Sequence, residues 1–126
     1  MNRSKYANRK VMIDGIKFDS WKEARRYREL KLLLLAGEII WLEMQVKFEL
    51  IPAQYGPPCG VYTRGAKKGQ PKKGKCIEQS VVYVADFVYW HNGERIVEDT
   101  KGMRTKDYII KRKLMLYVHG IRIKEV

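Results

Sequence analysis

The chain has 126 residues, the length of one domain with a modest core, and its hydrophobic content of 45% excludes a wholly disordered protein. Lys and Arg number 26 against 14 Asp and Glu, and the net charge of +12 indicates a polyanionic partner, most often nucleic acid; a basic surface that serves only solubility is the alternative. The two cysteines, Cys59 and Cys76, form neither a disulfide framework nor a zinc motif, and no apolar run is long enough to cross a membrane, so we expect a cytoplasmic protein.

A small hairpin and a helix are predicted near the start of the chain. Asp14-Gly15 lies within residues 11–18 and is typical of a tight hairpin turn. Ser20 is a typical N-cap for a helix over residues 21–36 that ends at Gly37. The predicted apolar stripe of this helix comprises Ala24, Tyr27, Leu30, Leu34 and Leu35, and the predicted solvent face comprises Lys22, Arg25, Arg26 and Glu29.

Glu23 does not join the solvent face of that helix, because it projects between Leu30 and Leu34 in the apolar stripe. One interpretation is a capping box, in which the Glu23 carboxylate reaches back to the amide of Ser20. The other is that the carboxylate points into a site inside the fold. Both interpretations are open at the level of the sequence.

Residues 45–51 predict the first strand of the sheet, because apolar residues alternate there with charged ones and Pro52 ends the run. Gln45 stands at the beginning of this strand. Residues 55–79 then change in composition, with five glycines, three prolines and no acid before Glu78. This predicts a flexible basic loop inserted between the first two strands of the sheet. Its cations are Arg64, Lys67, Lys68, Lys72, Lys73 and Lys75, and we expect them to follow a phosphate backbone; a solvated linker is the alternative.

The most informative pattern lies in residues 80–102. Residues 81–90 are apolar except for Asp86, which predicts a strand buried on both faces. Asn92-Gly93 is a strong signal for a two-residue hairpin, because both turn positions require a positive φ. The chain therefore returns as a second strand over residues 95–101.

This turn places Asp86 opposite Asp99, with Lys101 on the same face and Glu98 on the other. Directly opposed residues have Cβ atoms about 5 Å apart, so two carboxylates here repel each other unless a cation lies between them. A divalent cation with oxygen ligands explains the cluster, and Lys101 is then placed to hold an anion or a water beside it. The alternatives are that Asp86 caps a strand end or pairs with Lys101, and that a bulge changes the register.

The C-terminal part predicts a helix and a final strand. Thr105 is a typical N-cap for a basic helix over residues 106–119, which carries Lys111 and Lys113 and ends at Gly120. Residues 121–126 alternate and predict a strand that can reach the sheet only by a crossover, so we expect a parallel, right-handed connection. The predicted fold class is α/β, with a mixed sheet flanked by helices in a single domain over residues 1–126.

Asp86, followed on the next strand by Asp99-Thr100-Lys101, resembles the signature of the PD-(D/E)xK nuclease superfamily. The predicted order of elements is similar to the restriction-endonuclease-like αβββαβ core of that superfamily. Three stretches resemble a small family of bacteriophage and prophage proteins of uncharacterised function: D-G-I-K-F-D-S-W-K-E-A, L-E-M-Q and V-E-D-T-K-G. More distantly, the chain is similar to archaeal Holliday-junction resolvases and to the endonuclease subunit of a transposition system.

The resemblance implies a role for each matched residue. Asp86 and Asp99 match metal ligands of the superfamily, and Glu23 matches the helix glutamate that completes the metal site in many members. Lys101 matches the lysine that orients or polarises the attacking water. Gln45 resembles a glutamine often found on the first strand. A bulged strand would present Glu98 as a ligand in place of its neighbour.

We therefore predict a Mg²⁺-dependent endonuclease that hydrolyses phosphodiester bonds in DNA, with Mn²⁺ able to replace Mg²⁺. The basic loop, Lys111 and Lys113 would contact phosphates, which carry no sequence information, so we expect a structure-selective enzyme. The resemblance implies branched DNA such as a Holliday junction, in phage recombination or replication and in the cytoplasm of the host cell. Two nicks in one junction would require a homodimer.

Three alternatives are kept. The first is a catalytically inactive nucleic-acid-binding module of the same fold. The second is a small basic RNA-associated structural protein, which leaves the clustered acids unexplained. The third is a nuclease subunit that needs a phage or host replication or recombination protein for activity.

Overall fold

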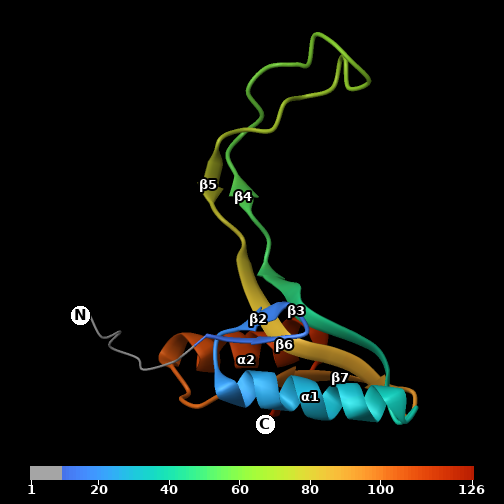
Figure 1. The fold of residues 1–126 in the computed structure, drawn as a ribbon. Coiled ribbons are helices and arrows are strands. Elements are labelled where there is room, and N and C mark those ends of the chain that lie inside the picture. The colour runs from blue at the N-terminus through green and yellow to red at the C-terminus, as the bar shows by residue number, and fades with distance from the viewer. Residues whose placement is uncertain (1–9) are drawn as a thin grey trace, which may run out of the picture.

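The computed structural model describes residues 10–126, and within this range the chain forms a mixed α/β fold (Figure 1). The elements follow in the order β1 (Val11–Ile13), β2 (Ile16–Phe18), α1 (Trp21–Leu35), β3 (Ile40–Ile51), β4 (Gln54–Tyr55), β5 (Cys76–Glu78), β6 (Val81–His91), β7 (Glu94–Asp99), α2 (Lys106–His119) and β8 (Lys124–Glu125). Strands β3, β6, β7 and β8 form a four-stranded sheet in that order, and β1–β2 and β4–β5 form separate two-stranded pairs. The prediction of a mixed sheet in an α/β fold is confirmed.

Both tight hairpins predicted from the sequence are present. Asp14 and Gly15 have φ angles of 53° and 75°, and Asn92 and Gly93 have φ angles of 50° and 79°. Positive φ at both turn residues gives the turn the twist of the strands that it joins. As a result, His91 pairs with Glu94 and the register of β6 against β7 is the predicted one.

The two helices begin at the predicted caps. The Ser20 side chain accepts a hydrogen bond from the Glu23 amide at 3.2 Å, and the Thr105 side chain accepts one from the Tyr108 amide at 3.2 Å. Such caps satisfy amides that have no partner inside the helix. Helix α2 ends where Gly120 adopts a left-handed φ of 67°.

Strand β8 is parallel to β7, as the crossover argument predicted, but it is shorter than residues 121–126. The amides of Gly120 and Ile121 donate to the carbonyls of Leu116 and Met115 at the end of α2. This is a helix-terminating pattern that uses the backbone groups of both residues. The first residues of the predicted strand therefore belong to the helix cap.

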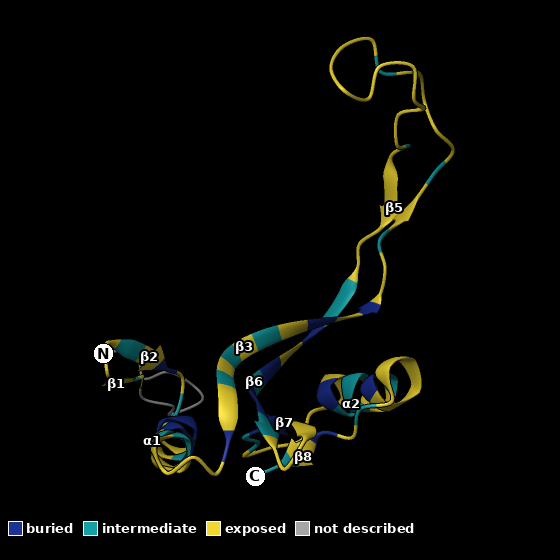
Figure 2. Cartoon of the chain, turned by 90° about the vertical axis from the view of Figure 1, so that its right-hand side faces the viewer, coloured by how far each residue is buried: buried dark blue, intermediate teal, exposed yellow. Residues whose placement is uncertain are grey.

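The sheet lies between the two helices, as Figure 2 shows for β3 and β6. The residues buried with α1 are called the α1-side cluster: Phe18, Ala24, Tyr27, Leu30, Ile39, Phe87 and Tyr89. The residues buried with α2 are called the α2-side cluster: Phe48, Leu50, Tyr83, Ala85, Val88, Val97, Tyr108, Met115 and Ile123. Apolar burial on both faces explains the continuous apolar run of β6.

The side of β6 that faces each helix changes at Asp86. Tyr83 and Ala85 belong to the α2-side cluster, whereas Phe87 and Tyr89 belong to the α1-side cluster. Side chains two residues apart share a face in a regular strand, so the alternation along β6 is interrupted between Ala85 and Phe87, a point that we call the twist. Asp86 lies at this twist and is half-buried.

The same change occurs on β3. Met44 packs against the α1-side cluster and Val46 against the α2-side cluster, and between them Gln45 has a left-handed φ of 53°. Met44 pairs with Phe87 and Val46 pairs with Ala85, so Gln45 lies across from the twist in β6. The two central strands therefore change faces together.

The predicted basic loop lies within a longer projection, the basic arm (residues 52–80), which extends away from the rest of the fold (Figure 1). Strands β4 and β5 pair within it, and Val61 bridges to Pro71 nearer its tip. A Cβ atom on Gly74 would lie 2.2 Å from the Pro57 carbonyl oxygen, so only glycine allows the two sides of the arm to approach so closely. The predicted loop thus contains paired backbone.

Two predictions for α1 are wrong in detail. Leu35 was placed in the apolar stripe, but its side chain is 83% exposed because the helix ends there and the chain turns away at Gly37. Arg26 was placed on the solvent face, but it is half-buried because it reaches β7 and pairs with Glu98. Within residues 10–126, neither helix is long and apolar enough to span a membrane.

Candidate functional site

Three carboxylates from separate elements gather at the twist in the sheet. Glu23 comes from the first turn of α1, Asp86 from the middle of β6 and Asp99 from the end of β7. Gln45 connects two of them: its Nε2 donates to Glu23 Oε1 at 2.9 Å and lies 3.4 Å from Asp86 Oδ1. The Glu23 carboxylate therefore points into this cluster, although its backbone amide takes part in the helix cap.

The left-handed conformation of Gln45 helps to build the cluster. A non-glycine residue in this region costs about 1–3 kcal/mol and persists only when its surroundings hold it. The bonds of its side chain, together with the change of faces in β3, provide that support. Gln45 is thus a structural bridge between α1 and the two central strands.

Thr100 holds Asp86 from the neighbouring strand. Its amide and its hydroxyl both donate to Asp86 Oδ2, each at 2.8 Å. The recorded pairing of β6 with β7 stops at Phe87 and Glu98, one step before Asp86 and Asp99. The amide and the hydroxyl of Thr100 therefore connect to the Asp86 side chain at the position where the backbone pairing of β6 with β7 has ended.

Asp99 is held by Tyr83 and Lys101. The Tyr83 hydroxyl donates to Asp99 Oδ2 at 2.5 Å, and Lys101 Nζ lies 3.4 Å from Asp99 Oδ1. The Lys101 ammonium also lies 4.6 Å from the centre of the Tyr108 ring. One alternative considered from the sequence was an ion pair between Lys101 and Asp86. In the structure, Lys101 pairs with Asp99 instead.

The acids of the cluster lie close to one another and are at least partly buried, and the pKa values of Glu23 and Asp99 are raised as a result. Burial, followed by the charge of Asp86, raises the pKa of Glu23 from 4.5 to about 7. Burial also raises the pKa of Asp99; the charge of Asp86 adds to this rise, and the bonds from Tyr83 and Lys101 oppose it. Burial and the charge of Asp86 thus disfavour the ionised forms of Glu23 and Asp99, and a bound cation would stabilise those forms.

The donor chemistry of the cluster suits a divalent cation, although the carboxylates do not converge on one point. Asp99 Oδ1 is buried and makes no hydrogen bond, and carboxylate oxygens are the ligands that Mg²⁺ prefers. Among residues 10–126, no three Asp, Glu, His or Cys side chains are grouped closely enough to hold a metal ion as they are oriented. Their oxygens bond instead to Gln45, Thr100 and Tyr83.

Glu98 faces away from this cluster, as the register predicted. Its side chain is fully buried, and Arg26 binds both of its oxygens, with Nε at 2.8 Å from Oε1 and Nη2 at 2.9 Å from Oε2. The Tyr89 hydroxyl donates to the same carboxylate. With its oxygens bonded to Arg26 and Tyr89, Glu98 ties α1 to β7.

The predicted nucleic-acid-binding residues fall into two groups. Six exposed cations lie on the basic arm: Arg64, Lys67, Lys68, Lys72, Lys73 and Lys75. Lys111 and Lys113 lie on α2, in the body of the fold, with Lys111 half-buried and Lys113 exposed. The arm projects away from that body, so the two groups occupy separate parts of the molecule (Figures 1 and 2).

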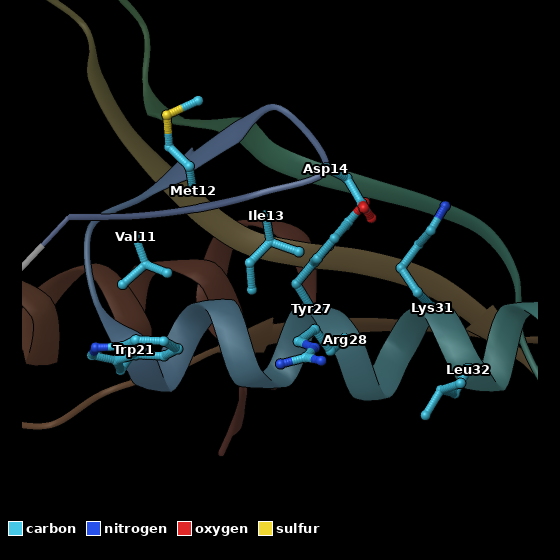
Figure 3. A pocket seen from close by; sticks show the side chains of 9 residues that line it. All are labelled: Val11, Met12, Ile13, Asp14, Trp21, Tyr27, Arg28, Lys31 and Leu32. Atoms are coloured by element: carbon cyan, nitrogen blue, oxygen red, sulfur yellow. The ribbon is translucent and has the colours of Figure 1, made fainter.

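A pocket of about 580 Å³ lies apart from the acids, between the β1–β2 hairpin and α1 (Figure 3). Met12 and Trp21 give it apolar walls, and Tyr27 projects from α1 toward the hairpin turn. The Tyr27 hydroxyl donates to Asp14 Oδ2 at 3.2 Å. None of the three clustered acids is among its described lining residues.

Gln45 and Lys101, which hold Glu23 and Asp99, were predicted as site residues from the sequence, but the other partners of the acids were missed. Thr100 stands inside the D-T-K motif, but nothing in its spacing marked it as a partner of Asp86. Tyr83 carried a usable signal, because a tyrosine in a buried strand needs a partner for its hydroxyl. The pairing of Arg26 with Glu98 depends on how α1 packs on β7, and no local pattern reports that packing.

One comparison with known proteins identifies a family. The family model described as "Protein of unknown function (DUF1064)" matches residues 3–124, which is nearly the whole chain. No curated protein matches the chain, and no solved structure matches it.

Proposed function

The chain belongs to the family described as "Protein of unknown function (DUF1064)", and from this premise we propose that it is a metal-dependent endonuclease that hydrolyses phosphodiester bonds in DNA. The observation that carries the proposal is the gathering of Glu23, Asp86 and Asp99 beside Lys101 at the twist of the sheet. Burial and mutual repulsion raise the pKa of Glu23 to about 7. Such perturbed acids are typical of functional sites.

The acids of the cluster bond to Gln45, Thr100 and Tyr83, but within residues 10–126 only one of them also pairs with a cation. The fully buried Glu98 is paired with an arginine, as buried charges in a stable core usually are. Asp99, its neighbour on the opposite face, is also buried, but its Oδ1 makes no hydrogen bond and has only the Lys101 ammonium, 3.4 Å away, beside it. The contrast between adjacent acids favours a ligand for Asp99.

Each residue has a proposed part in the reaction. Glu23, Asp86 and Asp99 would hold Mg²⁺ or Mn²⁺, and the ion when bound lowers the pKa of water and stabilises negative charge on phosphate oxygens. Lys101 would orient the attacking water and hold its developing charge near the phosphate. Gln45 would position Glu23, to which it donates a hydrogen bond.

The basic arm supports nucleic acid as the substrate. Its six exposed cations would contact phosphates, and such contacts carry no sequence information, so the proposed enzyme selects DNA by its shape. The same proposal includes branched DNA as the substrate, a homodimer as the active form and a restriction-endonuclease-like core as the fold. They rest on the resemblance of Asp86 and Asp99-Thr100-Lys101 to the PD-(D/E)xK signature.

The test is cleavage of labelled linear duplex, single-stranded and four-way junction DNA, in Mg²⁺ and in EDTA. We expect cleavage only with Mg²⁺, and a loss of about 10²-fold or more in Asp86→Ala, Asp99→Ala and Lys101→Ala. Glu94→Ala is the matched control, because this exposed acid lies at the other end of β7. Equal cleavage by Asp99→Ala and wild type would rule out the proposal.

A nucleic-acid-binding module without catalysis is the second candidate. The basic arm favours it, because its cations need no contribution from the acids. This candidate predicts salt-sensitive DNA binding that is unchanged by Asp86→Ala, with no cleavage of any substrate. Cleavage that appears only after a replication or recombination protein is added would instead identify a nuclease subunit.

A further inference from the structure

A second pocket, of about 550 Å³, lies directly beside the acid cluster. Lys22 on α1, the loop from Lys101 to Arg104, and Glu125 with Val126 at the end of the chain's last strand form its walls. Lys101 belongs to both places, because its ammonium lies 3.4 Å from Asp99 Oδ1. The pocket and the acid cluster therefore share Lys101. Its volume is within the range of about 300–1,000 Å³ that ligand pockets occupy.

The pocket has an excess of positive charge. Three cationic side chains line it, those of Lys22, Lys101 and Arg104, against one carboxylate side chain, that of Glu125. That carboxylate is already neutralised, because Arg104 Nε lies 2.5 Å from Glu125 Oε2 and Arg112 Nη1 lies 3.0 Å from Glu125 Oε1. These two bonds lower the pKa of Glu125, so it is ionised and bound at neutral pH.

The cations of the pocket have donors to spare. The Lys22 ammonium donates to the Lys101 carbonyl oxygen at 2.8 Å, which uses one of its three N–H groups. Arg104 uses its Nε on Glu125, and its side chain is 61% exposed. Lys22 is fixed by its bond to the loop, so its remaining donors are already oriented beside the site.

We propose that this pocket binds a backbone phosphate of the nucleic acid, next to the phosphate at the acid cluster. The ligand class, a nucleic-acid phosphate, and the second phosphate at the acid cluster rest on the proposed function. Lys22 and Arg104 are then binding residues that position the strand for Lys101 and the acids. An open pocket of this size accepts a nucleotide unit of the strand rather than a lone ion.

The expected effect follows from counterion release. Each neutralised phosphate contributes a slope of about −0.9 to the dependence of log K on log salt, which is about eight-fold in affinity at about 0.1 M salt. Lys22→Gln and Arg104→Gln should each weaken DNA binding by about that factor and reduce the slope by about 0.9. Arg25→Gln is the matched control, because Arg25 is an exposed cation of the same helix and does not line the pocket.

The experiment is a titration of the full chain with a fluorescein-labelled duplex DNA, followed by anisotropy at several salt concentrations in EDTA, so that no metal-dependent cleavage occurs. Thermal melts of each variant show whether it is folded. Arg104→Gln also releases one partner of Glu125, so Lys22→Gln, which breaks no ion pair, is the variant that decides. The expected result is a weaker, less salt-dependent complex for Lys22→Gln and an unchanged one for Arg25→Gln.

If Lys22→Gln and Arg25→Gln weaken DNA binding equally, the inference is wrong, because the general positive charge of α1 and not the pocket would then explain the binding. The inference is also wrong if Lys22→Gln binds DNA with the same affinity and the same salt slope as the wild type. These outcomes are separate from those of the cleavage assay. If the wild type cuts none of the DNA substrates in Mg²⁺ but Lys22→Gln still weakens binding, the phosphate pocket stands and the endonuclease proposal fails.

Discussion

Replacing Glu23 by glutamine should stabilise the protein at alkaline pH. Glu23 is 7% exposed and lies beside Asp86 and Asp99, so its charged form is disfavoured in the folded state. Glutamine has nearly the same shape, and its side-chain oxygen can still accept the bond from Gln45 Nε2. The substitution therefore removes a charge without opening a cavity.

The size of the effect follows from the pKa of Glu23. Below pH 4.5 the carboxyl group is protonated in both the folded and the unfolded chain, and its ionisation costs no stability. As the pH rises from 4.5 through about 7, the unfolded chain loses this proton first, so the free energy of unfolding falls. Above about pH 8 the loss is nearly complete and amounts to about 3–4 kcal/mol at most, at about 1.4 kcal/mol for each pKa unit. For a chain of this length, that is about 10 °C in Tm.

The assay is thermal and urea unfolding of wild type and Glu23→Gln at pH 5 and pH 8, in EDTA and at constant ionic strength. We expect nearly equal stability at pH 5 and a more stable variant at pH 8. Glu29→Gln is the control: Glu29 is exposed on the same helix, and its loss should cost at most about 1 kcal/mol at either pH. A Glu23→Gln variant that is no more stable than the wild type at pH 8 would refute the raised pKa of Glu23. Added Mg²⁺ should narrow the difference by binding to the wild type.

Three further predictions concern stability and binding. Arg26→Ala leaves the fully buried Glu98 without its cation and should lower the free energy of unfolding by about 3–5 kcal/mol in urea titrations; a loss below about 1 kcal/mol would contradict the buried pair. Tyr83→Phe removes the donor to buried Asp99 Oδ2 and should cost about 1–3 kcal/mol by the same measurement, with unchanged stability counting against that bond. Replacing residues 52–80 by a short turn should leave Tm nearly unchanged, because neither buried cluster includes the arm. The same replacement should lower the salt slope of DNA binding by about five, because it removes six cations. An unfolded product would show that the arm supports the fold.

Much of the fold could be predicted because local signals agreed with one another. Asp14-Gly15 and Asn92-Gly93 need positive φ and fixed two hairpins, and Ser20 and Thr105 fixed two helix starts. The parallel placement of β8 followed from the crossover alone. The paired backbone of the arm escaped prediction, because glycines and prolines in that stretch indicate a loop and the pairing of β4 with β5 joins residues far apart in the chain.

The candidate site was predicted in part. The turn placed Asp86, Asp99 and Lys101 on one face and Glu98 on the other, and helical periodicity marked Glu23 as inward. The twist between Ala85 and Phe87 could not be seen, because it arises from packing one sheet against two helices. The bonds of Thr100 and Tyr83 to these acids leave no spacing pattern in the sequence, although the buried Tyr83 hydroxyl needed a partner. The bond from Lys22 to the Lys101 carbonyl forms only when α1 docks on the sheet.

The sequence by itself determined which residues face one another across a turn, because a two-residue loop admits one register and side chains alternate with period two. It also determined where the helices begin. Only the tertiary structure decided that Gln45 meets Glu23, that Arg26 neutralises Glu98 and leaves Asp99 with an unsatisfied oxygen, and that Lys22 faces the Lys101 loop. These contacts join residues separated by between 22 and 79 positions in the chain. They form only when helices dock on the sheet, and no local pattern encodes that docking.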